Sequence, residues 1–138
     1  MSEVFDTKIA IVLREDLMPW QALNVTAFLT GGITAQDGDI IGKPYKDRAG
    51  NTYNALIRQP IIVLSAAKET LKKVHERSLK RGVKSSLYIE EMFSTGHDTA
   101  NLAVFAEYDP ENARVVGIAL HADKKLVDKI IKGAKMHR

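Results

Sequence analysis

Asp16, Trp20 and Asn24 form the first group of side chains that could do chemistry. They lie where a short apolar run passes into a predicted helix, and the free N–H groups at a helix N-terminus favour anions. Trp20 is the only tryptophan of the chain and is expected in the first helical turn. The alternative is structural: Asp16 caps the helix, Trp20 is a hydrophobic staple and Asn24 is a buried amide.

A second polar group lies in residues 95–101, which hold five polar side chains in seven positions. A helix cap explains Thr95 and Asp98, which stand at capping-box spacing, but it leaves His97 and Asn101 unexplained. His97 is the best candidate in this group for an acid or base near neutral pH.

Together the two groups predict a small-molecule pocket between the first helix and residues 95–101. Its expected lining is Asp16, Trp20, Asn24, Thr95, His97 and Asn101. These residue types identify neither the molecule nor a reaction, so the sequence leaves open whether the protein is an enzyme.

The sequence predicts no metal site and no cofactor. The chain has no cysteine, and its histidines (His75, His97, His121 and His137) are not spaced as a metal pair on a helix face. His97 and His121 are the better placed for a ligand, because ligands of open α/β sheets gather beyond the carboxyl ends of strands. His75 falls on the inward stripe of a helix, which favours a hydrogen-bonded, half-buried imidazole. No glycine-rich dinucleotide motif, P-loop, nucleophile elbow or zinc-protease motif occurs.

The net charge of +3 conceals two basic segments. Residues 68–84 carry seven basic and two acidic side chains, residues 123–138 carry six and two, and the rest of the chain is acidic. Side by side, these segments would form a positive face with affinity for phosphate groups. An RNA-binding module is therefore an alternative function, and a solvated helix face is the structural alternative. The residues expected to contact RNA are Lys72, Lys73, Lys80, Arg81, Lys129 and Lys132.

Strands and helices alternate along the chain. Short apolar runs rich in β-branched residues predict strands at 8–13, 60–64, 85–91 and 115–120. Helical spacing predicts a first helix that Gly31 and Gly32 end, and further helices over 66–81, about 97–107 and 123–134. Ser65 is the expected N-cap of the second helix. A β-hairpin is expected within 39–58, because Asp47 and Gly50 suit a type I turn followed by a bulge.

These elements predict a single α/β domain over residues 1–138. The expected architecture is a three-layer α/β/α sandwich, with a mixed sheet of about four core strands plus the β-hairpin. The composition, 45% hydrophobic and 27% charged, is typical of a globular domain and excludes a disordered chain. The start of the chain has no apolar signal core and no window reaches 18 apolar residues, so we expect a cytoplasmic protein without a membrane partner.

Residues 8–18, KIAIVLREDLM, resemble the start of the type II peptidyl-tRNA hydrolases, where a strand runs into an Arg-x-Asp-Leu turn. Residues 59–64 before a basic helix are similar to the second core strand of that family, and residues 116–133 resemble its last strand and helix. The segments ALN at 22–24 and FSTGHDTAN at 93–101 look like an uncharacterised bacterial family, a domain of unknown function with the same fold. The resemblance covers nearly the whole chain and implies a peptidyl-tRNA hydrolase II-like fold.

The chain departs from those hydrolases at the positions where they carry their activity. The hydrolases open the first helix with a Gly-Lys pair, whereas this chain has Trp20 and Gln21, and Asn24 is the best match for a glutamine one turn later. Their Asp-Ala-Gly after the third strand is replaced by Glu-Met-Phe at 91–93. We therefore expect the fold without peptidyl-tRNA hydrolysis. A structural homodimer without catalysis is the third possibility, beside the small-molecule pocket and the RNA module.

Overall fold

A five-stranded mixed sheet forms the centre of the domain, in a computed structural model that describes residues 4–138. The first three residues of the acidic start lie outside the described range. The strand order is β5-β6-β1-β4-β7; β1 and β4 are parallel, and the other neighbours are antiparallel. The strands are β1 (Thr7–Arg14), β4 (Ile61–Ala66), β5 (Ser86–Ile89), β6 (Val115–Asp123) and β7 (Lys135–Met136). The predicted mixed sheet is confirmed, with β7 as an additional short strand.

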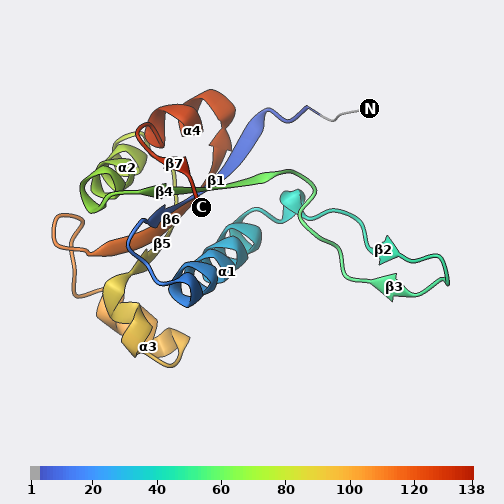
Figure 1. Ribbon diagram of the computed structural model, residues 1–138, viewed down its shortest axis with the longest axis horizontal. Coiled ribbons are helices and arrows are strands. Elements are labelled where there is room, and N and C mark those ends of the chain that lie inside the picture. The colour runs from blue at the N-terminus through green and yellow to red at the C-terminus, as the bar shows by residue number, and fades with distance from the viewer. Residues whose placement is uncertain (1–3) are drawn as a thin grey trace.

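Helices cover both faces of the sheet (Figure 1). The long helix α1 (Pro19–Gln36) lies on one face, and α2 (Lys68–Lys80) and α4 (Lys124–Ile130) lie on the other. A short 3-10 helix, η2 (Glu90–Ser94), and helix α3 (Asp98–Phe105) follow β5, near the start of α1. Within residues 4–138, no helix is both long enough and apolar enough to cross a membrane.

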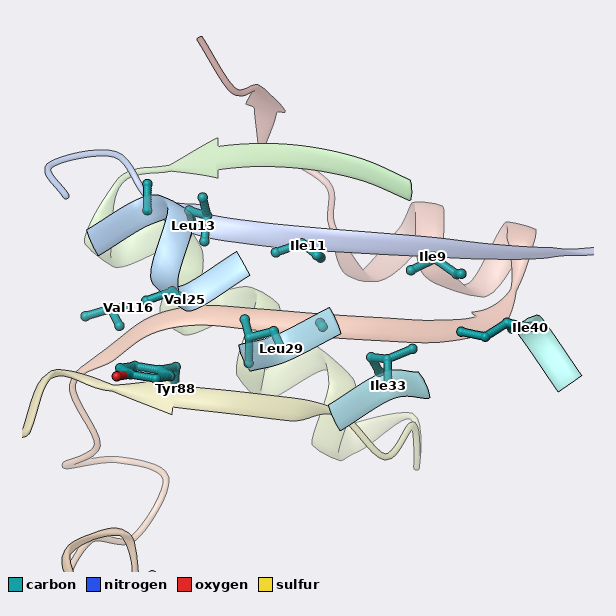
Figure 2. Close-up of a cluster of buried hydrophobic side chains, with 11 residues drawn as sticks. Ile9, Ile11, Leu13, Val25, Leu29, Ile33, Ile40, Tyr88 and Val116 are labelled. Atoms are coloured by element: carbon teal, nitrogen blue, oxygen red, sulfur yellow. The ribbon is translucent and has the colours of Figure 1, made fainter. Parts of the chain in front are cut away.

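Strand β1 is buried on both faces because helices lie on both sides of the sheet, which explains its continuous apolar run. Ile9, Ile11 and Leu13 point toward α1, where Val25 and Leu29 complete the cluster (Figure 2). The alternate side chains of the strand face α2 and α4. This double core fixes the start of α1 above the carboxyl end of β1.

Helix α1 continues past Gly31 and Gly32, so the predicted end of the helix is wrong. Beyond both glycines, Ile33 is 3% exposed, and its burial outweighs the cost of about 1 kcal/mol for each helical glycine. Gly32 also permits a close approach to the sheet, since a Cβ there would lie 2.7 Å from the Ser86 Oγ in β5.

The predicted N-caps of α1 and α2 are wrong as well. Helix α1 follows Met18, whose N–H donates to the Gln21 Oε1 at 3.0 Å. Helix α2 follows Ala67, which provides no side-chain cap. Asp16 and Ser65 each lie before these residues, outside the first turn.

The predicted hairpin exists and projects away from the body of the domain (Figure 1). A 3-10 helix, η1 (Gly38–Ile40), leads into it, and its strands are β2 (Tyr45–Lys46) and β3 (Thr52–Tyr53). We call residues 41–58 the arm. At its tip Gly50 has a φ of +93°, and the Asp47 carboxylate accepts from the Asn51 N–H at 2.9 Å. No residue of the arm is buried.

Candidate functional site

A cavity of about 290 Å³ lies between the first half of α1, strand β5 and the segment that includes η2 and the start of α3. We call it the aromatic cavity. Five of the six predicted pocket residues line it together: Trp20, Asn24, Thr95, His97 and Asn101. The remaining lining residues are Phe28, Leu29, Leu87, Tyr88, Met92, Phe93, Gly96 and Asp98.

Four aromatic rings stand in a row along this cavity. The ring centroids of Trp20 and Phe93 are 5.9 Å apart in an edge-on arrangement. Phe93 and Tyr88 are 5.2 Å apart, and Tyr88 and Phe28 are 6.0 Å apart. Tyr88 is 4% exposed, whereas Trp20 and Phe28 at the two ends are more than half exposed. The row therefore offers accessible aromatic surface that is anchored in the core.

Burial raises the pKa of the Tyr88 phenol, because the phenolate would lose its hydration. The ring therefore stays neutral at physiological pH. It contributes apolar surface and a neutral hydroxyl group to the cavity, and no charge.

Thr95 and Asn101 form the polar side of the cavity. The Thr95 hydroxyl lies within hydrogen-bond reach of two acceptors, the Met92 carbonyl oxygen at 2.9 Å and the Asn101 Oδ1, and its single hydrogen is donated to one of them at a time. An amide has both a donor and an acceptor end, so this contact leaves one end of Asn101 for another partner. The side chains are thus held in place by their own neighbours.

His97 is the N-cap of α3, a role that the sequence prediction gave to Thr95 and Asp98. Its Nδ1 accepts a hydrogen bond from the Ala100 N–H at 3.2 Å. Capping requires Nδ1 without a proton, so the neutral ring carries its proton on Nε2. The imidazole is exposed, and Nε2 is the nitrogen that remains for a proton transfer or a ligand.

Asp16 does not line the cavity, which corrects the predicted set. Its carboxylate accepts from the Arg14 Nε at 2.6 Å, and Arg14 also donates to Glu90 at 2.9 Å. The Asp16 side chain is 65% exposed, outside the cavity wall. Asp16 therefore belongs to a surface ion-pair cluster at the end of β1.

His121 lies at the other end of the sheet, although the sequence ranked it with His97. Strand β6 runs antiparallel to β1, so its carboxyl end is far from the carboxyl ends of β1 and β5. His121 Nδ1 is 2.7 Å from the Asp37 carboxylate, and its Nε2 is 3.0 Å from the Thr7 hydroxyl. This network joins the end of α1 to the start of β1.

The two basic segments are neighbours on the face of the sheet opposite α1. Arg77 of α2 donates to the Ile130 carbonyl at 3.0 Å and to the Lys132 carbonyl at 2.8 Å, which ties α2 to the end of α4. The six side chains predicted to contact RNA are all exposed: Lys72, Lys73, Lys80, Arg81, Lys129 and Lys132. Of these, Lys72 also donates to the carbonyl oxygen of Glu111 at 3.2 Å.

The sequence reasoning missed the aromatic part of the site. Phe28, Tyr88 and Phe93 come from three elements, and the sequence prediction assigned none of them to the pocket, although Phe93 opens the FSTGHDTAN segment at 93–101. A signal exists in hindsight, since Phe28 falls on the outer side of α1 rather than on its buried stripe. As for metals, no three histidine, aspartate or glutamate side chains within residues 4–138 come together as possible ligands.

Comparison with known proteins agrees with this architecture. A solved structure titled as a protein of unknown function, Atu0240 from Agrobacterium tumefaciens strain C58, is 61% identical to this chain. Its similarity covers 98% of this chain and 100% of the other, with a TM-score of 0.96. The search of curated proteins found no match. The model of the family described as protein of unknown function (DUF2000) matches residues 7–138, and the chain therefore belongs to the DUF2000 family.

Proposed function

We propose that this protein binds a small, planar, uncharged molecule in the aromatic cavity. The observation that carries the proposal is the row of four rings beside the Thr95–Asn101 pair. Aromatic side chains bind planar rings through offset stacking and edge-to-face contact, each worth roughly 1 kcal/mol beyond the buried area. A few polar groups at one side of an apolar pocket then orient the ligand.

The charge of the cavity favours a neutral ligand. Three of its lining residues are ionisable, Tyr88, His97 and Asp98, and burial keeps the Tyr88 phenol neutral. The Asp98 carboxylate lies in the first turn of α3, where it interacts favourably with the helix dipole. The amide groups of Asn24 and Asn101 instead suit an amide or a ring nitrogen on the ligand, because they can donate and accept.

The sole tryptophan makes this binding directly measurable. Trp20 lines the cavity, so a bound aromatic ring should change the fluorescence of the protein. We would titrate the protein with benzamide, nicotinamide and adenine, and with cyclohexanecarboxamide as the saturated counterpart of benzamide. The expected result is saturable quenching by at least one planar probe, with an affinity about tenfold or more above that of the saturated amide.

Two phenylalanine variants provide the matched comparison. Phe93→Ala removes the central ring of the row, whereas Phe105→Ala removes a ring of α3 that does not line the cavity. Binding should be lost in the first variant and retained in the second, while circular dichroism verifies that both are folded. Equal affinity of the two variants, or no saturable response to any planar probe, would refute the proposal.

We further propose a peptidyl-tRNA hydrolase II-like fold that has lost the hydrolase activity. The positions that depart from the resembled family support this, since Trp20, Met92 and Phe93 all line the aromatic cavity. Gln21 stands where the resemblance implies the lysine and Glu91 where it implies the aspartate, and the rings of Trp20 and Phe93 stand where it implies glycines. Purified protein incubated with N-acetylated lysyl-tRNA should release no more N-acetyl-lysine than a blank, and hydrolysis proportional to protein concentration would disprove the loss.

An RNA-binding module is the second candidate function, favoured by the contact between α2 and α4. Exposed cations on adjacent helices release counterions when they bind phosphates, so the affinity should fall steeply with salt. The test is tRNA binding by fluorescence anisotropy at low and at physiological salt. Replacement of Lys73 and Lys129 by glutamine should weaken tRNA binding and make the affinity less dependent on salt. If the anisotropy does not change on titration with the wild-type protein at low salt, this function is excluded.

A further inference from the structure

We propose that the exposed face of α1 and the arm form the interface of a two-fold symmetric homodimer. In this dimer the two α1 helices pack antiparallel, and the arm of each copy lies against the acidic segment of the other. We define the acidic segment as residues 90–111. The inference rests on other observations than the small-molecule proposal, although Trp20 and the cavity-lining residues within 92–101 belong to both surfaces.

Helix α1 lacks the charged residues that the solvent-facing side of a surface helix ordinarily carries. None of its 18 residues is charged. Its inner side packs on the sheet through Val25, Leu29 and Ile33, yet Leu23 on the outer side is 73% exposed. The outer side of α1 thus combines exposed apolar side chains with uncharged polar ones, which is unusual for a surface that faces only water.

The flank of α1 carries three threonines that do not offer their hydroxyl hydrogens to solvent. Thr26, Thr30 and Thr34 each donate to the carbonyl oxygen four residues earlier, at 2.7, 2.8 and 2.8 Å. These local bonds satisfy the hydroxyl donors within the helix itself. Because these O–H donors are already satisfied, the flank needs no water to donate to, and another protein surface can cover it without leaving a donor unpaired.

The outer face of α1 is complementary to itself. The exposed residues Trp20, Leu23, Ala27, Gly31 and Ala35 recur at spacings of three and four and share one side of the helix. Their side chains run from large at the N-terminal end to small at the C-terminal end. In an antiparallel pair centred near Ala27, Leu23 of one copy faces Gly31 of the other. A Cβ on Gly31 would have nothing within 4 Å in the single chain, so the space beside it is open.

The arm supplies the rest of the interface. A helix of 18 residues is about 27 Å long, and its face offers roughly 300 Å² of contact. A stable dimer buries roughly 800 Å² on each partner, so the helix pair alone falls short. The arm carries Tyr45, Tyr53 and Leu56, all more than half exposed. A two-stranded hairpin without a core is marginally stable by itself, so these side chains need a partner surface.

Figure 1 shows that the arm and α3 lie at opposite ends of α1. A two-fold axis through the middle of α1 therefore brings the arm of one copy to α3 of the other. The two surfaces have opposite charge. The arm has four basic residues and one acidic residue, whereas the acidic segment has six acidic residues and no lysine or arginine.

The unpaired charges reinforce this match. Within the acidic segment, Glu90 and Glu91 are already paired with Arg14 and Arg114. The four other acidic residues have no ion-pair partner within the described part of the chain: Asp98, Glu107, Asp109 and Glu111. The same holds for Lys43, Lys46 and Arg48 of the arm.

A lipid surface fits the outer face less well than a second copy does. Interfacial helices combine their apolar side with lysine and arginine that bind anionic headgroups. Helix α1 has neither residue, and the basic helices α2 and α4 lie on the opposite side of the sheet. The decrease in side-chain size along α1 would make no difference to a fluid bilayer. It does suit an antiparallel second copy, in which large side chains face small ones.

Sedimentation velocity of the full-length protein tests the interface. The wild-type protein should sediment at twice the chain mass of 15.3 kDa at tens of micromolar. Leu23→Lys and Gly31→Phe should each raise the dimer dissociation constant by at least about tenfold. The matched control is Leu79→Lys, an exposed leucine on α2, which should leave the dissociation constant unchanged. Circular dichroism checks that each variant is folded.

Charge reversal tests the contact between arm and acidic segment. Lys43→Glu with Lys46→Glu should weaken the dimer, and so should Glu107→Lys with Glu111→Lys. All four changes in one chain restore opposite charges across the two-fold axis and should recover most of the affinity. A monomeric wild-type protein overturns the proposal, as does a dimer that Leu23→Lys and Gly31→Phe leave intact. Failure of the charge-reversed chain to recover its affinity refutes the contact between the arm and the acidic segment.

Discussion

His75 is a buried imidazole that the fold does not satisfy. The sequence places it on the inner stripe of α2 and predicts a hydrogen-bonded ring, but its Nδ1 has no hydrogen-bond partner within residues 4–138. The residue is 5% exposed. Burial lowers the pKa of the ring, because the imidazolium would lose its hydration.

We expect His75→Leu to increase the free energy of unfolding by about 1 kcal/mol near pH 8, because it removes an unpaired buried nitrogen. A histidine pKa that is lower in the folded state means that the unfolded chain binds more protons. In the wild-type protein, the part of the stability that depends on a neutral His75 is therefore fully present above the pKa of about 6.5 in the unfolded chain. It is lost as the pH falls below that value. The increase in the free energy of unfolding that His75→Leu produces should therefore be larger near pH 5.5 than near pH 8, as measured by urea unfolding at both pH values. A gain that does not change between the two pH values would contradict this.

At the residue scale, the sequence predicted six residues around the candidate site, of which five line the aromatic cavity and Asp16 does not. Trp20 and Asn24 follow from the helix start, and Thr95, His97 and Asn101 from a polar cluster that one cap does not explain. Asp16 has the same local signals. Its exclusion depends on Arg14, which is in turn positioned by Glu90, a residue 76 positions away. A contact at that separation has no signature in a local pattern.

Among the elements, the packing of α1 on β6 depends on the absence of one side chain. A Cβ on Gly117 would lie 2.5 Å from the Val25 Cγ1 and 3.0 Å from the Leu29 Cδ1. Valine is stiff at its first side-chain torsion, so it cannot easily turn away. Gly117 thus sets how closely the helix that carries Trp20 and Asn24 approaches the sheet.

We expect Gly117→Ala to destabilise the protein by about 1–3 kcal/mol through overpacking. Val25→Ala alone leaves a void and should cost roughly 2 kcal/mol. In the double variant the new methyl group occupies part of that void, so the combined loss should be smaller than the sum by about 1 kcal/mol. Urea unfolding of the four proteins measures this coupling. Additive losses would show that the two residues do not compete for the same space.

The limits of α1 show why element boundaries were harder to predict than element types. Its start was expected at Asp16, and the structure places it three residues later, at Pro19, a residue that suits the first helical turn. Its end was placed too early, because two successive glycines are a strong local stop signal. The tertiary contact of Ile33 with the core overrides that signal, and local propensity contains no term for it.

For the whole molecule, the alternation of strands and helices was enough to predict a mixed sheet covered on both faces. The arrangement of the arm was not predictable in the same way. The turn residues Asp47 and Gly50 predict a hairpin, but a hairpin pattern does not say whether the hairpin packs on the body or projects from it. Strand β7 was missed because only two residues pair, at the edge of the sheet beside β4.

The projection of the arm leads to a prediction about the stability of the isolated domain. The Gly42 N–H donates to the Leu56 carbonyl at 2.8 Å, so residues 43–55 can be replaced by an Asn-Gly turn without moving the two limbs. Since no arm residue is buried, the free energy of unfolding should change by less than about 1 kcal/mol. Urea unfolding at a protein concentration low enough to dissociate any assembly is the measurement.

The control for this excision is Ile40→Ala at the base of the arm. Ile40 is 1% exposed and belongs to the core under α1, so its truncation should cost about 2–5 kcal/mol. If removal of the arm costs as much as this core substitution, the arm contributes to the folding of its own chain. A small effect of the excision, beside a large effect of Ile40→Ala, means that the arm is retained for contacts outside its own chain.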